Sequence, residues 1–191
     1  MKENNKKILI HTCCAVCSGY PLKYLKELGY EPTAYFFNPN IYPQIEYVKR
    51  LEAQKKLCEM LECELIVDDY SSEFYCEVMQ GYENHQEGSE RCTRCFELRL
   101  LKTIQKAKEL GYDYYTTSLS ISPHKNFDVI KQVGNFFSEY YNINFVDVNF
   151  KKQNGFLKST SMAKEFDLYR QNYCGCDISM KRMLSPKLTK E

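Results

Sequence analysis

The chain has 191 residues, of which 43% are hydrophobic and 27% are charged. These values are typical of a folded globular protein and exclude a disordered, collagen-like or low-complexity chain. The net charge of +1 provides no strong overall field for nucleic acid, although a local basic patch would suffice. The basic residues near the two ends form such a patch or are solvated tails: Lys2, Lys6, Lys7, Lys181, Arg182, Lys187 and Lys190.

Ten cysteines are the most unusual feature of the composition. The first residues are polar, and the apolar run after them is only as long as a strand, so no signal peptide is expected. No stretch reaches the ~18 apolar residues of a transmembrane helix. We therefore expect a cytoplasmic protein with no membrane partner. In a reducing compartment, the cysteines indicate metal or redox chemistry rather than a disulfide framework.

Strands and helices are predicted to alternate along the chain. In order, we expect a strand at 8–11, a helix at 18–28, a strand at 32–37, a helix at 44–61, a strand at 64–67, helices at 71–81 and 92–110, a strand at 114–119, a helix at 127–140, a strand at 144–148, and helices at 156–168 and 177–184. In the first helix, Ser18 is a candidate cap and Pro21 a candidate first-turn residue, and Gly29 ends it. This alternation predicts one α/β domain over residues 1–191, with a mostly parallel five-stranded sheet covered by helices on both faces.

Three cysteines, Cys13, Cys14 and Cys17, directly follow the first strand. Open α/β sheets bind ligands at the carboxyl ends of their strands, so these thiols are expected at a ligand site. His11 precedes them and either tunes the site by hydrogen bonding or belongs to the core. His124 lies in the loop after the fourth strand, where it meets substrate or faces solvent.

Cys92 and Cys95 form a CxxC motif at the start of a predicted helix, whose N-terminus stabilises thiolates. Zinc sites, iron–sulfur clusters and dithiol redox pairs all use this spacing. Together with Cys13 and Cys14, the pair would supply the four thiolates of a [4Fe–4S] cluster. We favour a cluster over zinc, because adjacent cysteines reach two irons of a cube more easily than they reach one ion.

Cys174 and Cys176 are separated by one glycine. A disulfide across this spacing is strained and therefore oxidising, which suits catalysis. Alternatively, the pair binds a second metal ion beside the cluster. Cys17 joins either site or is a buried thiol. The remaining cysteines occur singly and are expected to be small buried hydrophobic residues: Cys58, Cys63 and Cys76.

The loop after the first strand contains neither a GxGxxG fingerprint nor a GxxxxGK[ST] phosphate loop. A nicotinamide site and a P-loop ATPase are therefore not expected. Electrons would have to come from an external donor.

Four segments resemble the QueH family of epoxyqueuosine reductases, and the likeness runs from about residue 7 to residue 182. They are 11–17 (HTCCAVC), 92–100 (CTRCFELRL), 118–125 (SLSISPHK) and 168–176 (LYRQNYCGC). The resemblance implies a fold similar to the α/β nucleotide-hydrolase (HUP-like) type. It also implies reduction of epoxyqueuosine to queuosine in tRNA, the last step of queuosine biosynthesis, by a cobalamin-free iron–sulfur mechanism.

The same resemblance implies roles for individual residues. The implied cluster ligands are Cys13, Cys14, Cys92 and Cys95. Cys174 and Cys176 would be the redox-active pair or, with Cys17, ligands of an adjacent mononuclear iron. The implied partners are a tRNA that carries epoxyqueuosine and the external electron donor.

A mechanistic hypothesis follows, because removal of the epoxide oxygen needs two electrons and two protons. The dithiol would store both electrons, or an adjacent iron would bind the oxygen as a Lewis acid. The substrate base lies in a single-stranded loop and can stack on an aromatic ring such as Tyr173. Four basic residues contact phosphates of the anticodon loop or form internal contacts: Arg94, Arg99, Lys125 and Arg170.

Three other functions fit part of the pattern. A cluster-containing tRNA-thiolating enzyme of the ATP-pyrophosphatase type needs a Ser/Gly-rich loop after the first strand, where this chain has cysteines. A zinc-stabilised RNA-binding module needs only four thiolates and would be colourless. A thiol–disulfide oxidoreductase would not need seven cysteines in three motifs.

Overall fold

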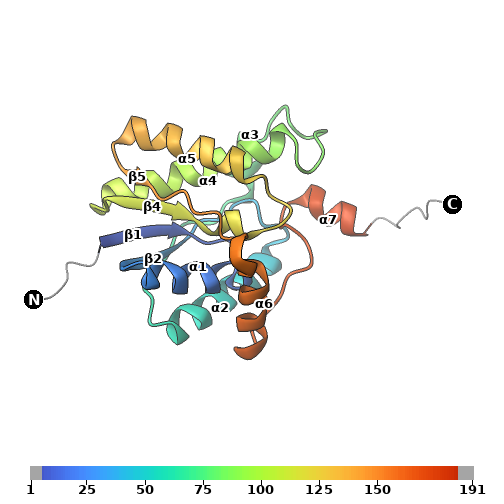
Figure 1. Ribbon diagram of the computed structural model, residues 1–191. Coiled ribbons are helices and arrows are strands. Elements are labelled where there is room, and N and C mark those ends of the chain that lie inside the picture. The colour runs from blue at the N-terminus through green and yellow to red at the C-terminus, as the bar shows by residue number, and fades with distance from the viewer. Residues whose placement is uncertain (1–5, 185–191) are drawn as a thin grey trace, which may run out of the picture.

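Five parallel strands form the centre of the molecule, and the computed structural model describes residues 6–184 (Figure 1). The strands are β1 (Lys6–His11), β2 (Tyr30–Phe36), β3 (Leu65–Val67), β4 (Tyr114–Thr117) and β5 (Asn144–Phe145). Their order in the sheet is β3-β2-β1-β4-β5, and every neighbouring pair is parallel. The predicted five-stranded parallel sheet is confirmed. Lys2, Lys187 and Lys190 of the candidate basic patch lie outside the described residues.

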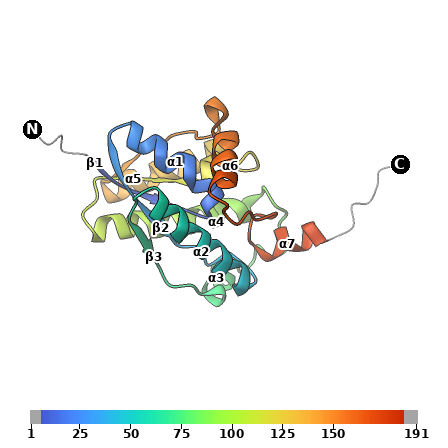
Figure 2. The same ribbon diagram turned by 90° about the horizontal axis from the view of Figure 1, so that it is seen from below.

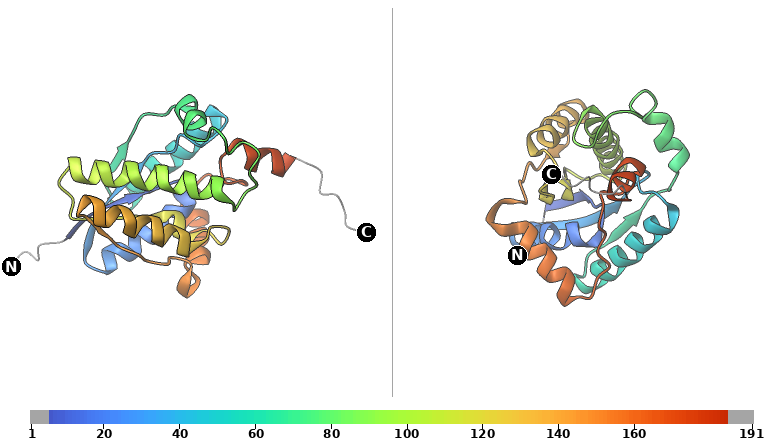
Figure 3. Two further views of the ribbon diagram at one scale, coloured as in Figure 1. Left: turned by 90° about the horizontal axis from the view of Figure 1, so that it is seen from above. Right: turned by 90° about the vertical axis from the view of Figure 1, so that its right-hand side faces the viewer.

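Helices cover both faces of this sheet, as predicted. They are α1 (Ala15–Glu27), α2 (Gln44–Met60), α3 (Ser72–Val78), α4 (Glu90–Glu109), α5 (Phe127–Tyr141), α6 (Gly155–Glu165) and α7 (Asp177–Leu184), with short 3-10 helices η1 (Ser118–Ile121) and η2 (Lys152–Asn154). Helices α4 and α5 lie on one face, and α1 and α2 lie on the other (Figures 1 and 2). Helix α6 packs on α1, where Met162 approaches Gly19. Helix α7 lies beyond the carboxyl edge of the sheet (Figure 3).

The central strand β1 explains where a ligand site can form. Its apolar run of Ile8, Leu9 and Ile10 is fully buried, because helices cover both faces of the sheet. The next strand in the chain, β2, pairs with one edge of β1, and β4 pairs with the other edge. The strand order therefore reverses between β1 and β4. In open α/β sheets, ligands bind outside the carboxyl ends of the strands at such a switch point.

Helix α1 starts earlier than expected, and two predictions about its first turn are wrong. Its N-cap is Cys14, which has an extended backbone, so Ser18 and Pro21 both lie inside the helix. The Ser18 hydroxyl donates to the carbonyl oxygen of Cys14 (2.7 Å) and to Gln54 (3.0 Å). This contact with α2 is tertiary, so no cap preference in the sequence reveals it. Similarly, residues 118–121 form η1 rather than the end of a strand.

Candidate metal and redox site

The first group of thiols lies where β1 ends and α1 begins. The sulfurs of Cys13, Cys14 and Cys17 lie within 4.8 Å of one another, and all three side chains are buried. The backbone N–H of Cys17 donates to the carbonyl oxygen of Cys14 (3.1 Å) in the first turn of the helix. The free N–H groups of a helix N-terminus stabilise negative charge. This group of thiols is therefore suited to bind a metal ion as thiolates.

The Sγ atoms of the adjacent Cys13 and Cys14 are 3.8 Å apart. A tetrahedral zinc ion with Zn–S bonds of about 2.3 Å places its sulfurs at a similar separation, about 3.8 Å. Adjacency in the sequence therefore does not separate a cluster from a single ion, contrary to our expectation. The sequence left undecided which site Cys17 joins, and the structure places its sulfur in this first group.

The second group of thiols lines one cavity beside the first group. Cys92 and Cys95 contribute from the first two turns of α4, and Cys174 and Cys176 from the loop before α7. The backbone N–H of Gly88 donates to the sulfur of Cys92 (3.2 Å). The predicted placement of the CxxC motif at a helix start is thus confirmed.

Asn40 lines the same cavity and is 2% exposed. Its Oδ1 atom has no hydrogen-bond partner among the described residues. A buried amide oxygen without a partner is costly, so Asn40 is an unsatisfied polar group at the wall of this cavity. The sequence placed Asn40 only in a turn, and its role at the site was missed.

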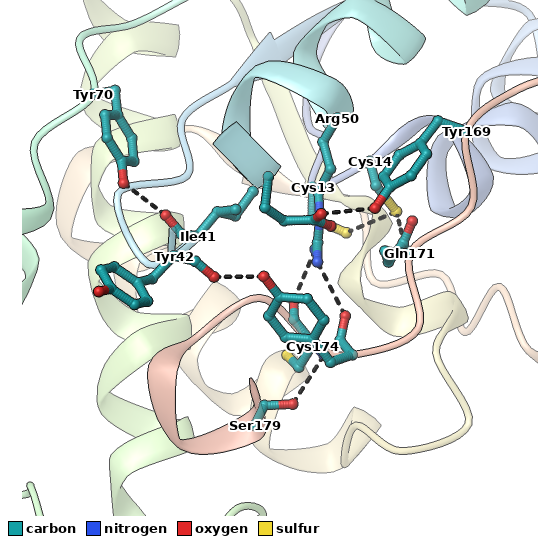
Figure 4. A network of polar contacts seen from close by, with 12 residues as sticks. Cys13, Cys14, Ile41, Tyr42, Arg50, Tyr70, Tyr169, Gln171, Cys174 and Ser179 are labelled. Carbon is teal, nitrogen blue, oxygen red and sulfur yellow. Dashed lines mark hydrogen bonds and ion pairs between the residues drawn. The ribbon is translucent and has the colours of Figure 1, made fainter. Parts of the chain in front are cut away.

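Arg50 of α2 holds the loop that carries Cys174 (Figure 4). It is 1% exposed and pairs with Glu46, with 2.7 Å between Nε and Oε1. Its two other nitrogens donate to the carbonyl oxygens of Cys174 (3.0 Å) and Tyr173 (3.1 Å). The guanidinium also lies over the Tyr173 ring, 5.2 Å from its centre. No spacing in the sequence indicated this role of Arg50, because the two carbonyl groups that it holds are more than 120 residues away.

Further hydrogen bonds attach the loop that carries Cys174 to the first cysteine group and to the segment between β2 and α2. Nε2 of Gln171 donates to the sulfur of Cys14 (2.7 Å), as Figure 4 shows. The backbone N–H of Tyr42 donates to the carbonyl oxygen of Gly175 (2.8 Å). Gly175 itself has φ +129°, a conformation that favours glycine. The glycine between the two thiols is therefore required by the shape of the loop.

Arg99 lies in the interior beside the second group. Its Nη1 is 3.9 Å from the sulfur of Cys95, and its Nη2 donates to Oδ1 of Asn38 (2.9 Å). Its Nε lies 3.3 Å from Nε2 of His11. Burial, reinforced by the Arg99 charge, lowers the pKa of His11 to about 3, so this ring is neutral. Of the two roles considered for Arg99, the structure shows internal contacts, and His11 belongs both to the core and to this network.

The thiols of the first group have unequal acidities. Hydrogen bonds with Cys14 and Cys17 lower the pKa of Cys13 well below its usual value. Burial raises the pKa of Cys14 to about 12, and hydrogen bonds with Cys13 and Cys14 raise the pKa of Cys17. In the second group, burial raises the pKa of Cys176 to about 12. Without metal, Cys13 is therefore the preferred thiolate of the first group.

Lys125 connects the two groups electrostatically. Burial alone would lower its pKa, but the nearby sulfurs of Cys174, Cys13 and Cys17 raise it instead. The same basic residue thus lies near thiols from the first and the third cysteine motifs. His124, one residue earlier, is exposed.

The single cysteines lie outside both groups. Cys58 is buried, as expected, whereas Cys63 is half-buried and Cys76 is exposed. The expectation of a buried thiol is wrong for Cys76, because that side of α3 faces solvent.

Comparison with known proteins supports the resemblance seen in the motifs. The family model for epoxyqueuosine reductase QueH matches residues 8–182. An epoxyqueuosine reductase QueH of Streptococcus pyogenes is 41% identical over 180 residues, which cover 91% of this chain and 70% of that protein. One from Thermotoga maritima is 35% identical over 177 residues, covering 91% and 90%. One from Helicobacter pylori is 42% identical over 181 residues, and the match spans 49% of its length.

A solved structure shares the fold at low sequence identity. It is the U34-tRNA thiolase NcsA from Methanococcus maripaludis with its [4Fe-4S] cluster, with a TM-score of 0.56 and 14% identity over 93% of this chain and 62% of that chain. This likeness supports the α/β fold alone. Within residues 6–184, no helix is long and apolar enough to cross a membrane. The family match and the identities show that the chain belongs to the epoxyqueuosine reductase QueH family and is an oxidoreductase.

Proposed function

We propose that this protein reduces epoxyqueuosine to queuosine in tRNA, the last step of queuosine biosynthesis. The observation that carries the proposal is the gathering of seven thiols from three distant segments at the switch point of the sheet. Membership of the QueH family supplies the substrate and the reaction. The substrate base lies in a single-stranded loop and can be splayed out to reach the cavity.

The thiols suit an iron–sulfur centre, and we propose Cys13, Cys14, Cys92 and Cys95 as the ligands of a [4Fe–4S] cluster. Cys13, Cys14 and Cys92 lie at the N-termini of α1 and α4, where helix dipoles stabilise thiolates, and Cys95 lies in the second turn of α4. When bound, the cluster would supply electrons one at a time from an external donor. In the alternative to a reducing dithiol, Cys174 and Cys176 would bind an adjacent iron together with Cys17.

We propose that Cys174 and Cys176 act as the reducing dithiol. Their oxidation to a disulfide releases two electrons and two protons. The epoxide consumes both, loses its oxygen as water and becomes an alkene. Arg50 holds the Cys174 carbonyl, and the positive φ of Gly175 permits the tight turn between the thiols. Reduction of the disulfide by the external donor would complete the cycle.

Anaerobic purification followed by metal and sulfide analysis tests the proposal. We expect about four irons and four sulfides per chain, broad absorbance near ~400 nm, and conversion of epoxyqueuosine in tRNA with a chemical reductant. Cys176→Ser should keep the iron and lose turnover. Cys76→Ser, at an exposed cysteine outside both groups, is the matched control and should keep both. Full turnover by Cys176→Ser would remove the dithiol from the mechanism.

A zinc-stabilised RNA-binding module is the second candidate. The observation behind it is the 3.8 Å separation of the Cys13 and Cys14 sulfurs, which one tetrahedral ion accommodates. A colourless protein that holds stoichiometric zinc after attempted cluster reconstitution would make this function the leading one.

A further inference from the structure

Arg99 differs from the other buried arginines of this protein. Arg50 pairs with Glu46 at 2.7 Å, and Arg91 pairs with Asp177 at 2.8 Å. Arg99 is 2% exposed, yet no carboxylate within residues 6–184 forms an ion pair with it. A buried charge without a counter-charge is strongly unfavourable. The interior of this protein must therefore supply negative charge near Arg99 from another source.

The groups that contact Arg99 directly show what that source is. Asn38 is uncharged, and the His11 ring supplies no negative charge in either protonation state. The remaining contact is the sulfur of Cys95, 3.9 Å from Nη1. Cys13 and Cys174 are also close enough to favour the charged guanidinium against the effect of burial. Sulfur is therefore the available source of counter-charge, from Cys95 in direct contact and from Cys13 and Cys174 at longer range.

We propose that Arg99 is the counter-ion of the metal–thiolate centre. Metal ligation makes thiolates of Cys95 and Cys13, and the fixed guanidinium offsets their negative charge. If the centre is a redox cluster, an adjacent positive charge stabilises the reduced state more than the oxidised state and raises the reduction potential. The counter-ion role holds for any thiolate-bound metal, and only its redox consequence rests on the proposed function.

Redox titration of the anaerobically purified protein tests this role. We expect Arg99→Gln and Arg99→Met to lower the midpoint potential, so that at a fixed ambient potential the ratio of reduced to oxidised cluster falls at least tenfold, or 59 mV for a one-electron couple. Arg99→Lys keeps the charge and should stay closer to the wild type. Arg94→Gln removes an exposed arginine of the same helix, paired with Glu97, and should leave the midpoint potential unchanged. An unchanged potential in Arg99→Gln and Arg99→Met at full iron content would overturn the proposal.

Two further outcomes are also decisive. If the uncharged variants lose their metal or fail to fold, Arg99→Lys separates charge from packing. Recovery of metal in that variant supports the counter-ion role, whereas equal loss assigns Arg99 to packing and overturns it. If the wild type holds zinc instead of a cluster, the proposed redox function fails, but the counter-ion role is still tested. Arg99→Met should then release zinc to a chelator faster than the wild type, and an equal rate would refute it.

Discussion

Arg50→Met is the most direct test of how the third cysteine motif is held in place. The substitution keeps an unbranched side chain but removes the charge and all the donor groups. Arg50 donates to Glu46 and to the carbonyl oxygens of Tyr173 and Cys174. After the change, the Glu46 carboxylate, which is 6% exposed, would keep only the hydroxyl of Tyr169 as a donor at 2.7 Å.

The size of the effect follows from this burial. Removing one partner of a buried ion pair costs about 3–5 kcal/mol, because the other charge is left uncompensated. For a chain of this length, each kcal/mol corresponds to roughly 2–4 °C in Tm, so we expect a loss of about 6–20 °C. Turnover should fall as well, because the loop with Cys174 and Cys176 loses its main attachment to α2.

Urea unfolding followed by circular dichroism, under anaerobic conditions, measures the change. Lys55→Met is the control on the same helix, because its ion pair with Glu52 is about half exposed. It should cost no more than about 1 kcal/mol. The double variant Glu46→Gln/Arg50→Met should recover part of the loss, since the unpaired carboxylate is gone. Equal stability of Arg50→Met and Lys55→Met, or full turnover by Arg50→Met, would refute this account of the loop.

Three glycines provide the remaining predictions. Gly175→Ala should cost about 1–3 kcal/mol through its positive φ and abolish turnover, because a Cβ atom there would lie 3.1 Å from Nη1 of Arg50. Gly29→Ala, at φ +80° with no atom within 4 Å, should cost about 1–2 kcal/mol and keep turnover. Equal losses of activity in Gly29→Ala and Gly175→Ala would contradict the crowding at Gly175. Gly134→Ala in α5 should destabilise by about 1–3 kcal/mol, because its Cβ would overlap the ring of Phe145. The urea midpoint of unfolding measures the stability of Gly134→Ala. A higher midpoint than the wild type, as helix propensity alone predicts, would contradict the overlap with Phe145.

The fold class could be predicted because its signals are local. The run Ile8–Ile10 is apolar without alternation, as a strand buried on both faces must be. Helices of crossover length between such strands permit parallel pairing and little else. Cysteine spacing is also local, so the CxxC motif was correctly placed at the start of α4. Local signals failed where a side chain had a distant partner, as at Ser18, which bonds Gln54 rather than capping a helix.

The sequence by itself therefore determined the order of the elements and the identity of the three cysteine motifs. Only the tertiary structure decided how the motifs meet: which sulfurs group with Cys13, and which cation faces them. Arg50 and Arg99 reach partners up to 124 and 88 residues away, respectively. The physical reason is range. Secondary structure follows from contacts within a few residues. Burial creates both the cost of an unpaired charge and the contact that relieves that cost. Burial exists only once the sheet and its helices have packed.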